Sequence, residues 1–131
     1  MFSVKNKLKV LLVDDNEDVL EFLHDVLGQS YEVVIAVNGL EALAKFQQET
    51  FDFIVSDVRM PKLSGIEMAH EVRKTSQLPI LFITASEDEF CEQIQSLTHV
   101  YKVKKPFRYQ ELQEKLKQLH ELYFKAFSEV A

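Results

Sequence analysis

Short apolar runs alternate along this chain with longer segments of helical periodicity, and this alternation constrains the fold more than any other feature. A continuous run of this length is typical of a β-strand buried on both faces of a sheet. Apolar residues three and four positions apart, as in the intervening segments, are typical of an amphipathic α-helix. The predicted strands are residues 10–13, 33–37, 53–56, 80–83 and 100–103.

Capping and loop residues mark where the predicted helices begin and end. Asn16 and Asn38 are each placed to cap a helix, because an asparagine side chain accepts hydrogen bonds from the first turn. Gly28 supplies a stop for the first helix, and Pro61 and Gly65 mark a loop before the third. The residues that define the five predicted helices are Val19, Leu20, Leu23, Val26 and Leu27; Leu40, Leu43, Ala44 and Phe46; Ile66, Ala69, Val72 and Arg73; Phe90, Ile94 and Leu97; and a last run from Tyr109 onward.

Five strands that alternate with five helices imply right-handed crossovers and a parallel sheet with helices on both faces. The expected fold class is therefore α/β, doubly wound around one five-stranded sheet. Ligands of such sheets bind outside the carboxyl ends of the strands, where the strand order reverses. The residues that follow each strand are therefore the candidates for function.

Length and composition agree with one soluble domain. The chain has 131 residues, about one domain, and 47% of them are hydrophobic. Its apolar runs are far shorter than the roughly 20 residues of a membrane span, and residues 1–10 lack the apolar stretch of a signal peptide. A single cysteine, Cys91, forms no disulfide within the chain. We therefore expect a cytoplasmic protein that does not associate with a membrane.

The charge of the chain argues against nucleic acid as a partner. Lys and Arg number 15 against 21 Asp and Glu, which gives a net charge of −6. A domain with this charge is repelled by phosphate backbones, so we expect no direct binding to nucleic acid. The exception is a basic cluster, typical either of a solvated edge or of a docking surface for an acidic partner. Its members are Lys102, Lys104, Lys105 and Arg108.

Charged and polar residues follow four of the predicted strands. Asp14 and Asp15 follow the first, Asp57 the third, Thr84 the fourth and Lys105 the fifth. Each one alone is typical of a turn or a helix cap, but together they meet at one edge of the sheet. Three carboxylates there would raise each other's proton affinity unless a cation compensates. Mg²⁺ (or Mn²⁺) is the expected cation, because magnesium binds through one or two carboxylates, waters and a phosphate.

The sequence contains neither of the common glycine-rich motifs that bind the phosphates of a nucleotide. The only glycines are Gly28, Gly39 and Gly65, so the chain has neither a GxxxxGK[ST] loop nor a GxGxxG fingerprint. An aspartate can instead accept the phosphoryl group itself, as the nucleophile that forms an aspartyl phosphate. Lys105 adds a positive charge and Thr84 a hydroxyl that donates to a phosphoryl oxygen. These residue types match phosphoryl transfer.

Four motifs, in order and at strand ends, carry a resemblance to a known family. They read VLLVDDN at residues 10–16, DVRMP at 57–61 with Gly65 beyond, Thr84 followed by Ala85, and KPF at 105–107. With them the chain resembles the receiver domain of two-component response regulators over residues 7–119. The resemblance implies a flavodoxin-like sheet with strand order 2-1-3-4-5. We divide the chain into a receiver domain, residues 1–119, and a C-terminal extension of the last helix, residues 120–131.

The resemblance implies a phosphoacceptor and its metal ligands. Asp57 would accept a phosphoryl group from a phosphohistidine on a sensor histidine kinase or a histidine phosphotransfer protein. Asp15 and Asp57 would bind Mg²⁺ together with the backbone carbonyl of Arg59, and Asp14 would assist through a water molecule. Such a protein takes part in its own phosphorylation and dephosphorylation, and we expect a switch rather than an enzyme.

The resemblance also implies how the phosphate is held. Thr84 would move toward the new phosphate and Lys105 would pair with it, and the bond between Lys105 and Pro106 would be cis. Arg59 and Ser86 occupy positions that tune the lifetime of the phosphate in this family.

The surface expected to switch is formed by the predicted helix near residues 90–97, the strand at 100–103 and the last helix. Its named residues are Tyr101, Lys102, Lys104 and Pro106. Family members usually have an aromatic residue three positions before the lysine of the Lys-Pro pair, where this chain has Lys102. Because side chains alternate along a strand, Tyr101 is expected to face the other way, which separates the aromatic ring from Thr84.

Two other readings stay open from the residues. One large superfamily of phosphatases and phosphotransferases uses an aspartyl phosphate with a second aspartate two residues after the nucleophile. Arg59 occupies that position here, so the general acid that this chemistry needs is missing. A receiver-like interaction module that is never phosphorylated is supported by Lys102.

The last helix is expected to outrun the sheet. Leu112, Leu116 and Leu119 are spaced to pack on the sheet, and the same spacing continues to Tyr123 and Ala126. Beyond Leu119 the helix has no core to enter, so we expect either a homodimer through this helix or a linker to an output domain. The apolar residues left over are Leu122, Tyr123, Phe124 and Phe127.

Overall fold

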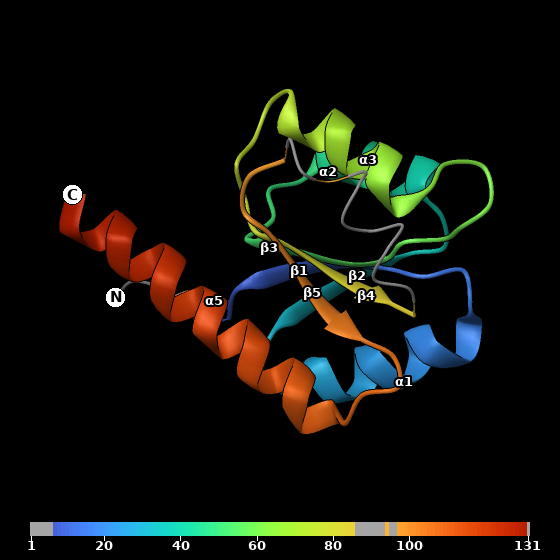
Figure 1. Ribbon diagram of the computed structural model, residues 1–131, viewed down its shortest axis with the longest axis horizontal. Coiled ribbons are helices and arrows are strands. Elements are labelled where there is room, and N and C mark those ends of the chain that lie inside the picture. The colour runs from blue at the N-terminus through green and yellow to red at the C-terminus, as the bar shows by residue number, and fades with distance from the viewer. Residues whose placement is uncertain (1–6, 86–93, 95–96, 131) are drawn as a thin grey trace, which may run out of the picture.

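A single parallel sheet with helices on both faces forms the protein (Figure 1). The computed structural model describes residues 7–85, 94 and 97–130, with side chains described as far as residue 122. The strand order is β2-β1-β3-β4-β5, which confirms the doubly wound α/β class and the predicted order. The strands are β1 (Lys9–Val13), β2 (Glu32–Ala36), β3 (Phe53–Asp57), β4 (Ile80–Thr84) and β5 (Val100–Lys104). The helices are α1 (Glu17–Leu27), α2 (Gly39–Gln48), α3 (Gly65–Arg73) and α5 (Tyr109–Val130).

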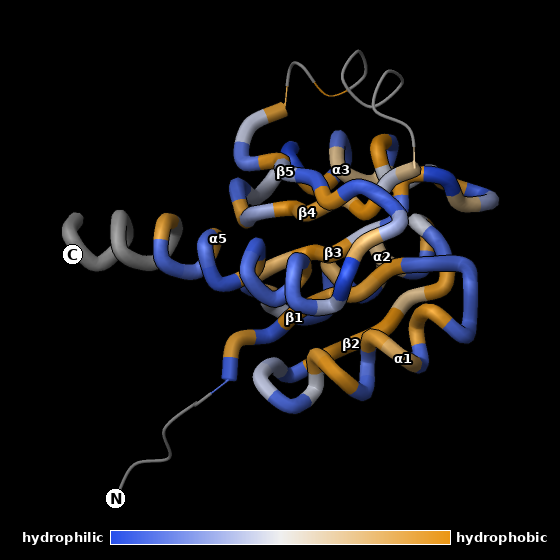
Figure 2. Tube along the Cα trace, turned by 60° about the horizontal axis from the view of Figure 1, so that its bottom comes forward, coloured by the Kyte–Doolittle hydropathy of each residue, from blue (hydrophilic) through white to orange (hydrophobic). Residues whose placement is uncertain are grey.

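The helices form two layers, one on each face of the sheet. Helices α2 and α3 cover one face, and α1 and α5 cover the other (Figure 1). The three central strands carry apolar residues on both faces, so a buried layer lies on each side of the sheet. Figure 2 shows the apolar residues concentrated along these strands and on the inner sides of the helices. Of the fourth predicted helix, only Ile94 and Leu97 fall among the described residues, and both pack on the α2 and α3 side.

Both predicted N-caps, Asn16 and Asn38, are present, whereas the N-cap of α3, Ser64, was not predicted. Asn16 Oδ1 accepts hydrogen bonds from the backbone N–H groups of Asp18 (2.9 Å) and Val19 (3.2 Å), and Asn38 Oδ1 accepts one from the N–H of Glu41 (2.8 Å). Helix α1 does end at Gly28, but with φ −62°. Its stop therefore does not use the left-handed conformation for which glycine is usually selected.

Strand β2 and helix α2 differ from the sequence-based prediction. Strand β2 begins one residue earlier than the predicted 33–37, because Glu32 pairs with Lys9 of β1. In α2 the predicted stripe is only half right, since Leu43 and Phe46 pack against the core whereas Leu40 and Ala44 are exposed. Leu40 and Ala44 are four positions apart and share the outer face of the helix. Apolar spacing alone did not reveal which side of α2 meets the sheet.

Helix α5 extends beyond the sheet. Leu112, Leu116 and Leu119 are buried against the α1 side of the core, whereas the side chain of Leu122 is 62% exposed. In Figure 1 the C-terminal half of α5 projects past the strands. The side chains at 123–130 lie outside the described residues, so the homodimer or linker role of this extension stays a prediction. Within the described part of the chain, no helix is both long enough and apolar enough to span a membrane.

Candidate phosphoacceptor site

The candidate site lies at the carboxyl edge of the sheet, where four strands end. Asp14 follows β1, Asp57 ends β3, Thr84 ends β4 and Lys105 follows β5. The parallel register aligns these ends, because Val13 pairs with Ser56, Asp57 with Ile83 and Thr84 with Lys104. The sheet therefore brings together residues that are far apart in the sequence, as the strand-end positions predict.

Three carboxylates converge at this edge. One side-chain oxygen from each of Asp14, Asp15 and Asp57 lies within 4.8 Å of the other two. Asp14 is buried, with 2% of its surface exposed, whereas Asp57 is half-buried and Asp15 exposed. Oxygen ligands that range from buried to exposed in this way fit a hard divalent cation that keeps some of its water. The residues present therefore fit the Mg²⁺ that the sequence predicts.

The environment of Asp14 favours its neutral form. Burial raises the pKa of this carboxyl above its ordinary value, and the nearby negative charges of Asp57 and Asp15 raise it further. Two groups oppose the shift, namely the backbone N–H of Asn16, which donates to Oδ1 at 2.9 Å, and the charge of Lys105. A bound divalent cation would offset the repulsion among the three carboxylates.

The two oxygens of the Asp57 carboxylate have different partners. Oδ1 accepts a hydrogen bond from the backbone N–H of Val58 at 2.8 Å, while Oδ2 lies 3.4 Å from Nζ of Lys105. The peptide bond between Lys105 and Pro106 is cis, as predicted. Lys105 thus reaches back from the end of β5 toward the side chain proposed as phosphoacceptor.

Two residues that the sequence-based prediction did not assign to the site lie directly against Asp57. Ser56 is fully buried and donates its hydroxyl to the backbone carbonyl of Asp57 at 2.8 Å. Gly65 begins α3 and donates its N–H to the carbonyl of Val58 at 2.8 Å. A Cβ atom at Gly65 would come within 2.2 Å of the Asp57 carbonyl oxygen. The available signal for Ser56 was its hydroxyl within an otherwise apolar strand.

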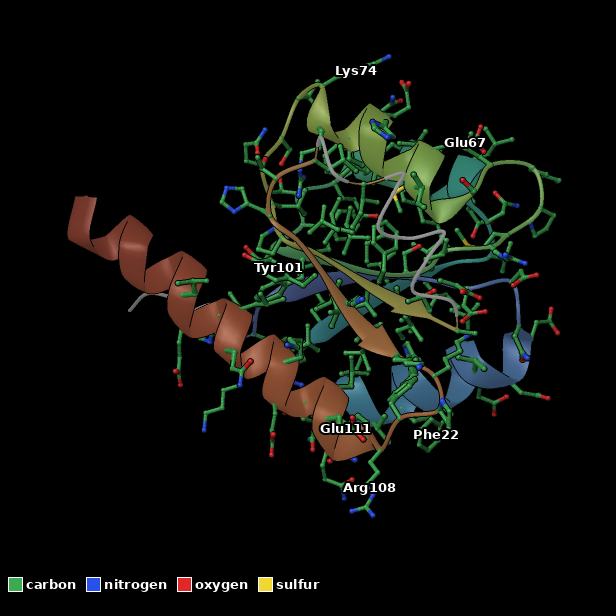
Figure 3. All side chains as sticks on the ribbon, viewed as in Figure 1. Phe22, Glu67, Lys74, Tyr101, Arg108 and Glu111 are labelled. Carbon is green, nitrogen blue, oxygen red and sulfur yellow. The ribbon has the colours of Figure 1, made fainter. Side chains whose placement is uncertain are left out.

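Strand β5 presents a lysine, not an aromatic ring, on the Thr84 side. Phe82 pairs with Lys102 and Thr84 with Lys104, and the register between β4 and β5 runs without interruption. Lys102 therefore shares a face with Thr84. Tyr101 packs with the α1 and α5 layer on the opposite face (Figure 3). The predicted separation of the aromatic ring from Thr84 is thus confirmed.

The basic residues of the sequence do not form one patch. Lys102 faces the Thr84 side of the sheet, Lys105 reaches Asp57, and Arg108 lies near the start of α5 and points away from the sheet (Figure 3). Lys104 and Pro106 are exposed at the end of β5, and Arg59 is exposed in the loop after β3. Lys102 and Lys104, two positions apart, share one face of β5, whereas Lys105 and Arg108 point elsewhere. Ser86 lies outside the described residues.

An apolar groove opens beside Lys105, between α1 and the start of α5. Its walls include Val19 and Phe22 from α1, with Phe107 and Tyr109 opposite. Phe22 is exposed and meets Tyr109 edge to face, with 6.4 Å between the ring centroids (Figure 3). Because Lys105 also lines this groove, an occupant of it would lie next to the acidic cluster.

A doubly wound sheet with three carboxylates and a lysine at its carboxyl edge is the arrangement that the resemblance to receiver domains implies. The response regulator receiver domain family matches residues 10–117 of this chain. The chain therefore belongs to the receiver domain family, and it is a receiver domain of two-component signalling.

Individual relatives agree with this assignment. The chemotaxis response regulator CheY4 of Vibrio cholerae is 36% identical with a TM-score of 0.78, over 86% of this chain and 98% of that chain. The response regulator protein TrrA of Thermotoga maritima, solved in complex with Mg²⁺ and BeF, is 34% identical with a TM-score of 0.75, over 86% and 98% of the two chains. Hybrid signal transduction histidine kinase D of Dictyostelium discoideum is 40% identical over 90 residues, which are 66% of this chain and 6% of the kinase.

The chain covers only a part of its curated relatives. It spans 6% of the length of the Dictyostelium kinase and no more than 46% of seven further curated relatives. The family assignment therefore concerns the receiver domain alone.

Proposed function

We propose that this receiver domain is a phosphoacceptor switch, in which Asp57 takes a phosphoryl group from a phosphohistidine. One observation carries the proposal. Side-chain oxygens of Asp14, Asp15 and Asp57 lie within 4.8 Å of one another, and Lys105 Nζ lies 3.4 Å from Asp57 Oδ2. A nucleophilic carboxylate, ligands for a divalent cation and a fixed positive charge thus meet at one point.

The chemistry asked of these residues is positioning and charge neutralisation. Asp57 Oδ2 attacks phosphorus, a P–O bond forms, and the P–N bond to the donor imidazole breaks. Mg²⁺ or Mn²⁺, held by Asp15, Asp57 and the backbone carbonyl of Arg59 with Asp14 assisting through water, would neutralise charge on the phosphoryl oxygens. Lys105 would pair with one of these oxygens. The complex of the Thermotoga regulator with Mg²⁺ and BeF supports this assignment by analogy.

The phosphoryl group stays on the chain, so the protein acts as a switch and not as an enzyme with a released product. Its donor would be a histidine kinase or a histidine phosphotransfer protein, which the similarity to a hybrid histidine kinase supports. The apolar groove beside Lys105 offers contact area to a protein donor. The net charge of −6 supports a protein partner over direct binding to nucleic acid. The cytoplasmic location stays a prediction from the sequence.

A second candidate is a receiver-like interaction module that is not phosphorylated. Lys102 favours it, because a lysine on the Thr84 face replaces the aromatic side chain that usually changes rotamer together with the threonine. Phosphorylation itself separates the two candidates.

The test is the intact mass of the protein after incubation with acetyl phosphate, with and without Mg²⁺. We expect a Mg²⁺-dependent gain of one phosphoryl group that hydroxylamine removes. Asp57→Ala should abolish the gain, and Asp25→Ala, which changes an exposed aspartate on α1, should leave it intact. Absence of any gain in the folded wild-type protein would favour the interaction module.

A further inference from the structure

One peptide unit beside the phosphoacceptor is held at both of its polar ends. Its carbonyl oxygen, on Asp57, accepts the hydroxyl of Ser56 at 2.8 Å. Its N–H, on Val58, donates to Asp57 Oδ1, also at 2.8 Å. The peptide unit is planar and rigid, so it cannot rotate about its length without disturbing both hydrogen bonds.

This arrangement links the Ser56 hydroxyl to the direction of the Asp57 carboxylate. The N–H of Val58 fixes Oδ1, and the other oxygen, Oδ2, then lies toward Lys105 at 3.4 Å. A carboxylate that is held at one oxygen presents the other in a defined direction. The hydrogen bond of the Ser56 hydroxyl goes to the carbonyl oxygen of the same peptide unit, so the hydroxyl is connected to the carboxylate through the peptide plane.

Packing of Gly65 against the same carbonyl oxygen further limits the freedom of this peptide unit. Gly65 lies so close that a Cβ there would come within 2.2 Å of the Asp57 carbonyl and 3.1 Å of Ser56 Oγ. Ser56 has no exposed surface. A buried hydroxyl in a strand costs free energy unless it is hydrogen-bonded, and here its bond goes to the phosphoacceptor residue.

We propose that Ser56 is a positioning residue, whose hydroxyl locks the Asp57–Val58 peptide and thereby aims Asp57 Oδ2 at the phosphoryl donor. The proposal rests on the proposed function of Asp57 as phosphoacceptor. It gives Ser56 an effect on the rate of phosphoryl transfer that is separate from its effect on stability.

The test compares Ser56→Ala with Val55→Ala, a buried neighbour on β3 that faces the α1 and α5 layer. The phosphorylation rate constant is measured by intact mass with acetyl phosphate at saturating Mg²⁺, well below the unfolding temperature. We expect about a tenfold loss of rate for Ser56→Ala, because misplacement of a reacting group by about 1 Å costs up to about a hundredfold. Val55→Ala should unfold at lower temperature and keep the wild-type rate constant.

Two further measurements keep the outcome clear. Ser56→Cys retains a weak donor of similar size, and its rate constant should lie between those of wild type and Ser56→Ala. Amide hydrogen exchange at Val58 should become faster in Ser56→Ala, whether or not the protein is phosphorylated. If Ser56→Ala does not fold, Ser56→Cys decides, since an unchanged rate in Ser56→Cys would overturn the proposal.

The result also separates this proposal from the one on which it rests. If the wild-type protein takes no phosphoryl group, the proposed function is refuted. The rate of amide exchange at Val58 would still test whether the Ser56 hydroxyl holds the Asp57–Val58 peptide in place. If the wild type is phosphorylated and Ser56→Ala has the same rate constant, the positioning role of Ser56 is refuted. The phosphoacceptor role of Asp57 would then still stand.

Discussion

Asp14 is the residue at which the electrostatic cost of the site is greatest, because it combines burial with two neighbouring carboxylates. We expect Asp14→Asn to raise the free energy of unfolding by about 1 kcal/mol without divalent cations, since relief of such functional strain commonly yields about 0.5–2 kcal/mol. The same variant should bind Mg²⁺ more weakly. Urea unfolding in EDTA checks the first effect. Asp15→Asn, at the exposed position, should stabilise less.

The advantage of Asp14→Asn should depend on pH. The pKa of Asp14 in the folded protein is raised above the ordinary value of 3.8, so the folded state binds the proton more tightly than the unfolded chain does. Acidification therefore stabilises the wild-type protein at this residue. The difference in the free energy of unfolding between Asp14→Asn and the wild type should have its full size above the pKa of Asp14 in the folded protein. It should shrink as the pH falls through that pKa and disappear below the ordinary value of 3.8. If the extra stability of Asp14→Asn instead increased as the pH fell, the pKa of Asp14 would not be raised by folding.

At the scale of elements, strand β2 is an edge of the sheet, and side chains of α2 bind two backbone groups at its C-terminal end. Lys45 Nζ donates to the carbonyl of Ile35 at 2.6 Å, and Glu41 Oε1 accepts from the N–H of Val37 at 3.0 Å. Lys45 and Glu41 also lie 3.7 Å apart as an ion pair. Charged side chains at an edge obstruct pairing with another strand.

We expect removal of both side chains, Glu41→Ala with Lys45→Ala, to make the protein self-associate at high concentration through β2. The matched control is Glu71→Ala with Lys74→Ala, which removes an exposed ion pair at the C-terminal end of α3 and, like the first double variant, leaves the net charge unchanged. Each double variant should lose less than about 1 kcal/mol of stability, as is usual for exposed pairs. Sedimentation velocity measures the association. Equal behaviour of the two variants would show that the covering side chains have no effect on association.

The sequence predicts an element correctly where its apolar pattern and capping residues agree with how the element packs in the folded protein. The strands, the caps at Asn16 and Asn38 and the convergence of Asp14, Asp57 and Lys105 follow from apolar runs and from what ends them. The exposure of Leu40 does not follow, because the period of a helix does not state which face meets the sheet. The hydroxyl of Ser56 beside Asp57 is visible in the sequence, but its hydrogen bond to the Asp57 carbonyl depends on the folded backbone and does not follow from the sequence.

At the scale of the whole molecule, a cation at the acidic cluster binds the folded chain, because the three carboxylates come from the ends of two paired strands, β1 and β3, that are about 40 residues apart in the sequence. Binding to the folded state alone raises stability by mass action, by about 2.7 kcal/mol at a hundred times the dissociation constant. We expect the thermal midpoint to rise with Mg²⁺ concentration at constant ionic strength. Asp57→Asn should lose most of this rise. A rise that Na⁺ reproduced at equal ionic strength would point to general screening.

The strand order also decides when the site can exist during synthesis. Asp14 and Lys105 lie 91 residues apart in the sequence (105 minus 14), and β5, which carries Lys105 at its end, pairs with β4 at the edge of the sheet. A nascent chain that has β1 to β4 but not β5 holds the carboxylates without the lysine that faces Asp57. The contact between Lys105 and Asp57 can therefore form only after the last strand has joined the sheet, and the proposed phosphoacceptor site is completed late in synthesis.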